Sequence, residues 1–265
     1  MNQFIDFRDK VCLITGAGSE NGIGFCTAKI LGELGGKIAL ISTTERIHQR
    51  TDELFKLGVN AKGYVADLMD RVQVEKTINQ IASDFGAIDI LINNAGMTQV
   101  GDSEEFIEFA ELSYEDWDTS INRNLTLTFN VTRNVLPYMK SNHYGRIVNV
   151  SSVTGPVVSN PGEAAYSAAK AALIGMSRSI AIEVAKDNIM INNVLPGWIA
   201  TASQTESEAA GGLNTPAGRG GSAVEVANMI VFLASEKASY ITGQSFIVDG
   251  GNTIQEYKGP SELYY

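Results

Sequence analysis

The chain has 265 residues, 44% hydrophobic and 19% charged, and no linker or block of charge divides it, which is enough material for one large α/β core. Its net charge of −10 argues against nucleic acid or an anionic membrane as a main partner. Residues 1–8 lack a basic segment followed by an apolar one, and no apolar stretch approaches membrane-spanning length. We therefore expect a cytoplasmic protein with no membrane partner.

The two cysteines, Cys12 and Cys26, have neither metal-binding nor redox spacing, so we interpret both as reduced packing residues. The two histidines are isolated, and no cluster of Cys, His or carboxylate residues has the spacing of metal ligands. The sequence predicts no metal site.

The first element is an apolar run, Val11–Thr15, typical of a buried parallel strand. It leads into a turn that contains Gly16, Gly22 and Gly24, and apolar residues at helical spacing follow as far as Leu34. Glycines at an exposed helix start let a pyrophosphate approach backbone N–H groups. The alternative is that these glycines serve only a tight turn.

Strand-like and helix-like segments then alternate, which predicts a doubly wound parallel sheet of the Rossmann type covered by helices on both faces. Further strands are expected at 37–42, 61–65, 88–92, 146–150, 189–195 and 245–248, and helices at 46–57, 70–84, 115–141, 163–186 and 222–234. We interpret residues 1–251 as one dinucleotide-binding and catalytic domain and residues 252–265 as a C-terminal tail.

Polar residues and glycines follow several of these strands directly. They are Asp67 after the third strand, Asn93 to Gly96 after the fourth, Ser151 and Ser152 after the fifth, and Pro196 to Thr201 after the sixth. Each has an alternative role as a helix cap or a turn. Ligands of such sheets bind beyond the carboxyl ends of the strands, so their joint placement indicates a ligand site there.

Tyr166 and Lys170 are four residues apart in a segment of strong helix formers, so a helix would place both on one face. An ammonium near a phenol favours the phenolate and lowers its pKa from about 10 toward the range useful for a general acid. Taken alone, such a pair is usually two surface residues. Together with the strand-end residues, it predicts hydride-transfer chemistry.

At this point the chain resembles the short-chain dehydrogenase/reductase family, and within it the branch of 3-oxoacyl-carrier-protein reductases. The resemblance runs from about Lys10 to Gly251. It is carried by Thr15-Gly16 with Gly22-Ile23-Gly24, Asn93-Asn94-Ala95-Gly96, Asn124, Ser152, Tyr166 with Lys170, Pro196-Gly197, and Ile241-Thr242-Gly243 before Val248-Asp249-Gly250-Gly251.

The resemblance implies a catalytic set of Asn124, Ser152, Tyr166 and Lys170. Tyr166 would exchange a proton with the substrate oxygen, Ser152 would hydrogen-bond that oxygen, and Lys170 would lower the pKa of Tyr166 and bond the nicotinamide ribose. Asn124 would hold the water that resupplies the proton. The implied cofactor contacts are Gly16, Ser19, Asn21, Gly22, Ile23, Gly24, Ser42, Arg46, Asp67, Leu68, Asn94, Ala95, Gly96, Tyr166, Lys170, Pro196, Gly197, Ile199 and Thr201.

Two spacings depart from the common pattern. Five residues separate Gly16 from Gly22 where three are usual, so the phosphate contacts within residues 17–21 stay open. Widened loops also occur in the enoyl-reductase branch, but there the tyrosine and lysine are further apart than Tyr166 and Lys170. The interval from Ser152 to Tyr166 is about one residue longer than usual, which a loop with Pro156 and Pro161 can absorb.

The cofactor preference is read at the end of the second strand, where Ser42 stands in place of a carboxylate that would bind the ribose hydroxyls of NAD. Ser42, with Arg46 nearby, favours NADP, although Glu45 weakens the argument and NAD stays possible. The resemblance further implies a homotetramer or at least a dimer, built on the helices around residues 113–141 and 163–186.

We expect the substrate to be a small-molecule ketone or secondary alcohol. Relatives that serve acyl carrier protein place arginines at positions matching His143 and Ile182, and neither position is basic here. Carrier-linked 3-oxoacyl reduction is the alternative, and a non-catalytic dinucleotide-sensing regulator is the alternative of another class. Residues 202–215 are expected to form a lid, and residues 97–100, 153–160 and Trp198 to shape the pocket.

Overall fold

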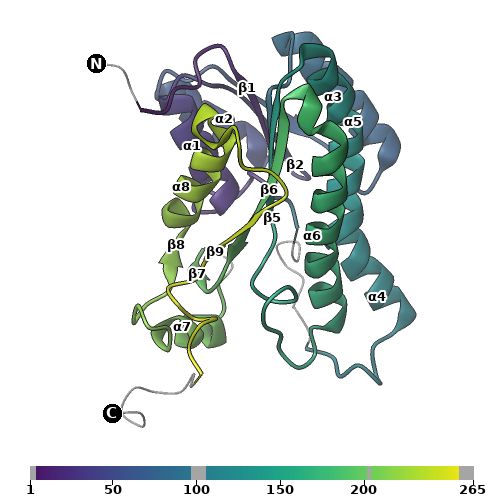
Figure 1. The fold of residues 1–265 in the computed structure, drawn as a ribbon, viewed down its shortest axis with the longest axis vertical. Coiled ribbons are helices and arrows are strands. Elements are labelled where there is room, and N and C mark those ends of the chain that lie inside the picture. Colours follow the sequence, from purple (N-terminus) through teal and green to yellow (C-terminus); the bar gives the residue numbers. More distant parts are fainter. Residues whose placement is uncertain (1–3, 97–105, 202–203, 257–265) are drawn as a thin grey trace.

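The computed structural model describes residues 4–96, 106–201 and 204–256 (Figure 1). Its centre is a seven-stranded sheet with strand order β3-β2-β1-β4-β5-β6-β9, in which all neighbours are parallel. The strands are β1 (Val11–Thr15), β2 (Lys37–Ser42), β3 (Ala61–Val65), β4 (Ile90–Asn93), β5 (Gly145–Val150), β6 (Ile189–Pro196) and β9 (Ser245–Val248). The order reverses between β1 and β4, which confirms the predicted doubly wound sheet.

Helices cover both faces of the sheet, because its strands are apolar on both sides (Figure 1). One face packs against α1 (Ile23–Glu33), α2 (Arg46–Lys56) and α8 (Ala223–Ala234). The other packs against α3 (Arg71–Phe85), α5 (Leu127–Asn142) and α6 (Ala164–Val184). Cys12 is buried and Cys26 half-buried, and both are free thiols, as packing residues would be.

The predicted helix over 115–141 is wrong in detail, because the structure divides it. It consists of α4 (Tyr114–Ile121), a π-helical turn η1 (Asn122–Thr126) and α5. A π turn widens the helix by one residue and is frequent at functional sites, but apolar periodicity does not reveal it. The predicted helix over 163–186 corresponds to α6 followed by a 3₁₀ turn, η2 (Ala185–Asp187).

The expected lid also contains a helix that the sequence analysis missed, α7 (Glu206–Leu213). Thr205 begins it with a capping box, in which its hydroxyl accepts from the Glu208 N–H and the Glu208 carboxylate accepts from the Thr205 N–H. Two short strands pair with each other: β7 (Ile199–Ala200), which precedes α7 in the sequence, and β8 (Gly221–Ser222), which follows it. Residues 202–203 and 97–100 of the predicted pocket lie outside the described part.

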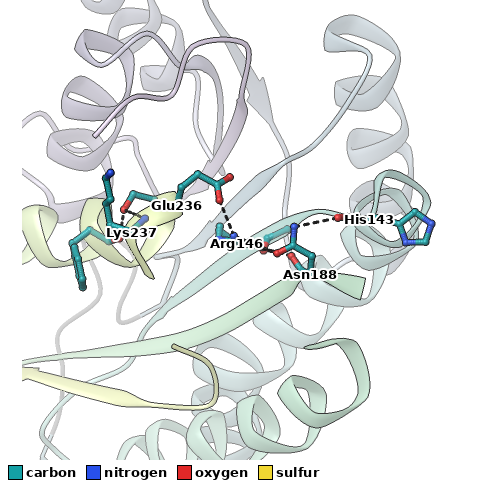
Figure 2. A network of polar contacts seen from close by, with 8 residues as sticks. His143, Arg146, Asn188, Glu236 and Lys237 are labelled. Carbon is teal, nitrogen blue, oxygen red and sulfur yellow. Dashed lines mark hydrogen bonds and ion pairs between the residues drawn. The ribbon is translucent and has the colours of Figure 1, made fainter. Parts of the chain in front are cut away.

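The amino edge of the sheet is closed by a buried arginine (Figure 2). Arg146 at the start of β5 is fully buried, and its guanidinium donates to the carbonyl oxygens of Gly145 at 2.8 Å and Asn188 at 2.9 Å. It also pairs with Glu236 at 3.2 Å, in the 3₁₀ turn η3 (Glu236–Ala238). One side chain thus joins the starts of β5 and β6 to the segment after α8.

The described helices include none that is both long enough and apolar enough to cross a membrane.

Candidate active site

The carboxyl ends of β1 and β4 are joined by side chain to backbone hydrogen bonds. The Thr15 hydroxyl accepts from the N–H groups of Asn94 and Ala95, at 3.1 and 3.0 Å. The Asn94 side-chain amide donates in return to the carbonyl oxygens of Thr15 and Gly16. The predicted contacts Asn94 and Ala95 therefore hold the start of the glycine turn in place.

The glycines of this turn are required by close packing. Gly16 has a φ of +68°, and a Cβ there would lie 2.7 Å from the Cα of Ala95. A Cβ on Gly18 would lie 2.7 Å from the Ser42 hydroxyl oxygen, and one on Gly24 would lie 2.5 Å from the Asn94 amide nitrogen. The turn is thus pressed against the tips of β2 and β4, as a backbone cradle for a ligand requires.

The widened part of the turn folds back on itself, since the Gly22 N–H donates to the Ser19 carbonyl oxygen at 3.2 Å. Gly22 precedes α1 and, as a glycine, supplies no side-chain cap to the first backbone N–H groups of the helix. Glu20 in the insertion lies 3.9 Å from Arg50 of α2. The two extra residues are accommodated in the turn, and the helix start is left open to an anion.

A cavity of about 920 Å³ opens beyond the carboxyl ends of the central strands. Eleven predicted site residues line it: Ile23, Asn94, Gly96, Asn124, Ser152, Tyr166, Lys170, Pro196, Gly197, Ile199 and Thr201. The remaining predicted contacts lie outside its lining: Gly16, Ser19, Asn21, Gly22, Gly24, Ser42, Arg46, Asp67, Leu68 and Ala95. The structure therefore brings the four predicted catalytic residues together with one half of the predicted cofactor contacts.

Lys170 and Tyr166 come from the first half of α6. Lys170 is only 3% exposed, and its ammonium donates to the Val150 carbonyl oxygen at 3.4 Å and lies 5.5 Å from the centre of the Tyr166 ring. A Cβ on Gly96 would lie 3.1 Å from the Lys170 nitrogen and 3.3 Å from the Asn124 side-chain oxygen. Gly96 is thus the point at which Lys170 and Asn124 converge, and any larger residue would separate them.

Asn124 lies in the π turn η1 and is 4% exposed. Its side-chain nitrogen donates to the Ser120 carbonyl oxygen at 3.1 Å. The extra residue of the π turn changes the angular phase of the helix at this point, so it helps to set the direction of Asn124 relative to α4 and α5.

Ser152 follows β5 directly, and its hydroxyl oxygen accepts from the Thr154 N–H at 3.0 Å. The loop after it is folded tightly against α6: Gly155 has a φ of +100°, and a Cβ there would lie 2.2 Å from the Ser167 carbonyl oxygen. The loop between Ser152 and Tyr166 is thus packed closely against α6.

The outer wall of the cavity carries polar residues that the sequence analysis did not assign. Glu163 lies one helical turn before Tyr166 and accepts from the Asn160 side-chain amide at 2.7 Å. Burial raises the pKa of Glu163, the Asn160 hydrogen bond opposes this, and the nearby Glu208 carboxylate raises it further. The spacing of three residues from Tyr166 was a signal for Glu163, because such residues share a helix face.

Glu208 of α7, within the expected lid, also lies in the cavity lining. Trp198 both lines the cavity and packs beneath α7, where a Cβ on Gly211 would lie 2.8 Å from its ring. Asn252 is also part of the lining and is 6% exposed, so the predicted tail begins inside the site.

Several predicted cofactor contacts have local structural roles in this structure. Asp67 accepts from the Met69 N–H at 2.9 Å, and Leu68 is 5% exposed and packs in the core. Arg46 is exposed, and its side chain donates to the Thr44 hydroxyl at 3.3 Å. In the described part of the chain, no three His, Cys, Asp or Glu residues lie close enough to hold a metal ion.

This fold, with a glycine turn at the switch point and a Tyr–Lys helix beside a serine, defines a dinucleotide-binding oxidoreductase. Residues 16–253 match the family model described as enoyl-(acyl carrier protein) reductase. The chain belongs to the short-chain dehydrogenase/reductase family, as its sequence indicated, and is an NADP-dependent oxidoreductase that interconverts ketones and secondary alcohols.

Curated relatives agree with the family over almost the whole chain. The chain is 38% identical over 251 residues to the 3-oxoacyl-[acyl-carrier-protein] reductase FabG of Escherichia coli, covering 93% of this chain and 98% of that one. It is 41% identical over 254 residues to FabG of Thermotoga maritima, with coverages of 92% and 98%. It is 36% identical over 259 residues to the oxidoreductase UcpA of Salmonella typhimurium, with coverages of 93% and 95%.

Proposed function

We propose that the chain is a carbonyl reductase that acts on a freely diffusing ketone, with Tyr166 as the general acid. The observation that carries the proposal is the convergence of Asn124, Ser152, Tyr166 and Lys170 on one cavity at the carboxyl edge of the sheet. These residues come from three separate segments, the π turn η1, the end of β5 and the helix α6, and tertiary packing brings them to one cavity.

The residues present fit a nicotinamide dinucleotide. The close contacts that Cβ atoms on Gly16, Gly18 and Gly24 would make define a narrow backbone cradle at the start of α1. From there, Asn94, Gly96, Pro196, Gly197, Ile199 and Thr201 would hold the nicotinamide half, because they line the cavity beside Lys170. When bound, NADPH supplies the hydride that reduces the substrate carbonyl carbon.

The residues of the chain supply the rest of the chemistry. Ser152 hydrogen-bonds the carbonyl oxygen and stabilises the negative charge that develops on it. Tyr166 donates its phenolic proton to the same oxygen, and Lys170 stabilises the phenolate that remains. Asn124, held by η1, orients the water through which Tyr166 regains its proton. In the oxidative direction Tyr166 accepts the proton instead.

The preference for NADP over NAD is supported by the tip of β2. Ser42 there lies against Gly18 of the glycine turn, where a carboxylate would repel the additional phosphate of NADP. Arg46 begins α2 four residues after Ser42, and its guanidinium is exposed to solvent, so it would be available to bind that phosphate.

The preference for a free ketone is supported by the charge of the cavity. Its described lining carries three carboxylates, from Asp116, Glu163 and Glu208, against two cationic side chains, Arg123 and Lys170. The excess of negative charge would disfavour an anionic substrate or an acidic carrier. Among the residues that the structure describes, neither Glu163 nor Glu208 has a lysine or arginine within ion-pair distance.

His143 and Ile182 are weaker evidence against a carrier-linked substrate than the sequence suggested. Both lie near the ends of α5 and α6 that lead into the starts of β5 and β6, at the edge of the sheet opposite the cavity. Within one protomer they do not bear on the entrance of the site, so the argument for a free ketone rests on the cavity itself.

Carrier-linked 3-oxoacyl reduction is the second candidate, favoured by the similarity to the FabG relatives. We also propose a cytoplasmic homotetramer of single-domain subunits, with residues 1–251 as the domain. Phe129 on α5 and Ile182 on α6 are 43% and 84% exposed, which supports an apolar contact between copies on these helices.

The test is a screen of purified protein against ketones of different charge, followed by NADPH absorbance, with NADH in parallel and a carrier-linked 3-oxoacyl substrate at low and moderate salt. Higher catalytic efficiency on small ketones supports the proposal. Higher efficiency on the carrier-linked substrate would assign the chain to fatty-acid elongation. Dinucleotide binding without turnover of any substrate would favour the non-catalytic regulator.

A further inference from the structure

A row of three asparagines crosses the centre of the sheet. Asn93 of β4 is the register partner of Asn149 of β5, and Asn149 is the register partner of Asn193 of β6. Each is at most 2% exposed. Each follows an apolar core residue by two positions, after Leu91, Ile147 and Ile191, so the row continues the sheet face that packs against α5 and α6. We call this row the asparagine layer.

The amides of the asparagine layer bond to one another and to a hydroxyl on each of two helices. The Asn93 amide donates to Asn149 at 2.8 Å and to the Thr132 hydroxyl of α5 at 2.9 Å. The Asn149 amide donates to the Ser177 hydroxyl of α6 at 2.9 Å and to Asn193 at 3.3 Å. Ser177 is fully buried and lies 2.7 Å from the Asn193 oxygen. The network therefore runs from α5 through three strands to α6.

Such a network fixes helix position more sharply than apolar contacts do. Side chains such as leucine and valine tolerate small sliding of a helix, because dispersion and burial change gradually. A movement of one residue along a helix axis, about 1.5 Å, would break these bonds and leave buried amides without partners. The asparagine layer is therefore suited to set the axial position of α5 and α6 on the sheet.

The elements joined by this network carry or adjoin the proposed catalytic residues: α6 carries Tyr166 and Lys170, Asn124 lies in η1 directly before α5, and Ser152 follows β5. Ser177 follows Lys170 by seven residues and Tyr166 by eleven, so all three lie along one stripe of α6. Asn149 precedes Ser152 by three residues at the end of β5. A second bond, from the Ser151 hydroxyl to the Lys170 carbonyl oxygen at 2.9 Å, joins the same two elements nearer the cavity.

We propose that Asn149 and Ser177 are positioning residues, which align Tyr166 on α6 with Ser152 at the end of β5 so that both reach one substrate oxygen. This inference rests on the proposed roles of Tyr166 and Ser152. It goes beyond them because it assigns their alignment to the hydrogen bond between Asn149 and Ser177. This bond lies at least one helical turn away from the cavity, and neither residue is part of the cavity lining.

The first test compares Ser177→Ala with Val184→Ala. Val184 is a buried core residue of α6 without a polar tie, so its truncation also destabilises the helix packing. For Ser177→Ala we expect kcat to fall about fivefold to twentyfold, with the dissociation constant for NADPH, measured by fluorescence in the absence of substrate, changed less than twofold. For Val184→Ala we expect a lower Tm and a kcat within twofold of the parent. Equal kcat for parent and Ser177→Ala would overturn the proposal.

The second test is a double-mutant cycle with Ser152→Ala. If Ser177 acts through the alignment of Tyr166 with Ser152, Ser177→Ala should have little further effect on kcat once the Ser152 hydroxyl is absent. Full additivity, with the same fold-loss in both backgrounds, would show that Ser177 affects kcat independently of Ser152 and would contradict the alignment role. If Ser177→Ala does not fold, Thr132→Val removes the α5 end of the network with little change in volume, and we expect a twofold to fivefold loss of kcat with unchanged NADPH binding. No loss there would count against the inference in the same way.

Failure of this inference is distinguishable from failure of the proposed function. If Ser152→Ala and Tyr166→Phe each abolish most of the activity while Ser177→Ala and Thr132→Val do not, the proposed function stands and the positioning role is wrong. If Ser152→Ala and Tyr166→Phe keep near-normal activity, the proposed catalytic set itself is wrong.

Discussion

The two edges of the sheet use buried polar groups in opposite ways. At the amino edge, the Arg146 guanidinium donates to two carbonyl oxygens and pairs with Glu236 (Figure 2). Its Cζ lies 4.6 Å from the centre of the Tyr144 ring. Burial raises the pKa of Tyr144. At the carboxyl edge, Lys170 and Asn124 are as deeply buried but face a cavity.

Groups that stabilise the fold and groups that act on a ligand are therefore located at opposite edges of the sheet. The amino edge joins chain segments to one another, so loss of a group there should appear in stability. The carboxyl edge directs polar groups into an open volume, so loss of a group there should appear in turnover. This separation is expected for a rigid fold that carries its functional site at one end of the sheet.

The largest expected effect belongs to the carboxyl edge. Tyr166→Phe keeps the ring but removes the transferable proton, so turnover should fall by about 10²–10⁴-fold, while dinucleotide binding and Tm stay near the parent values. Steady-state kinetics on the best ketone and a thermal melt measure both. Near-normal turnover would remove the proposed mechanism.

Arg146→Met tests the amino edge, where we expect a loss of stability rather than of turnover. The variant keeps much of the buried volume but removes the guanidinium donor from the carbonyl oxygens of Gly145 and Asn188, although the latter still accepts from the Gly145 N–H. It also leaves Glu236 without its partner, so the free energy of unfolding should fall by about 2–4 kcal/mol. Denaturant unfolding measures this change. Kinetic constants per folded molecule should stay within about twofold.

Arg178→Met is the matched control for this loss, because Arg178 is exposed on α6. It should change the free energy of unfolding by no more than about 0.5 kcal/mol. A large loss of turnover in the folded Arg146→Met protein would show that the two edges are coupled.

Ser42→Asp, at the tip of β2, tests the cofactor preference of the carboxyl edge. A carboxylate there repels the additional phosphate of NADP and accepts hydrogen bonds from the ribose hydroxyls of NAD, so the ratio of catalytic efficiencies should shift toward NADH by roughly tenfold or more. Thr43→Asp, one residue further on and exposed, adds the same charge as a control. If the unmodified protein already prefers NADH, our interpretation of Ser42 is wrong.

Glu163→Gln should have the smallest effect. Removing this charge should raise catalytic efficiency on a carboxylate-bearing ketone by roughly fivefold to tenfold and leave a neutral ketone within twofold. Because the pKa of Glu163 is raised, the parent enzyme should discriminate less against that anionic ketone as the pH falls through this pKa, when Glu163 becomes neutral. Glu206→Gln, on the exposed side of α7, is the control, and an equal effect there would exclude a specific role for Glu163.

The sequence alone was enough to predict the seven strands of the main sheet, their parallel arrangement and the four candidate catalytic residues. Strand-like runs of four to seven residues separated by helical periodicity admit few arrangements other than a covered parallel sheet. Tyr166 and Lys170 are local in the chain, and the polar residues after β4, β5 and β6 meet at one edge because parallel strands end there.

Only the tertiary structure decided which residues share the cavity and what holds them there. The π turn at Asn124 changes helix phase without changing composition, and α7 brings Glu208 to the site from a segment with little apolar content. The asparagine layer joins residues 39, 56 and 44 positions apart through single side-chain bonds. Such contacts depend on register between strands and on helix packing, which no local pattern of residues encodes.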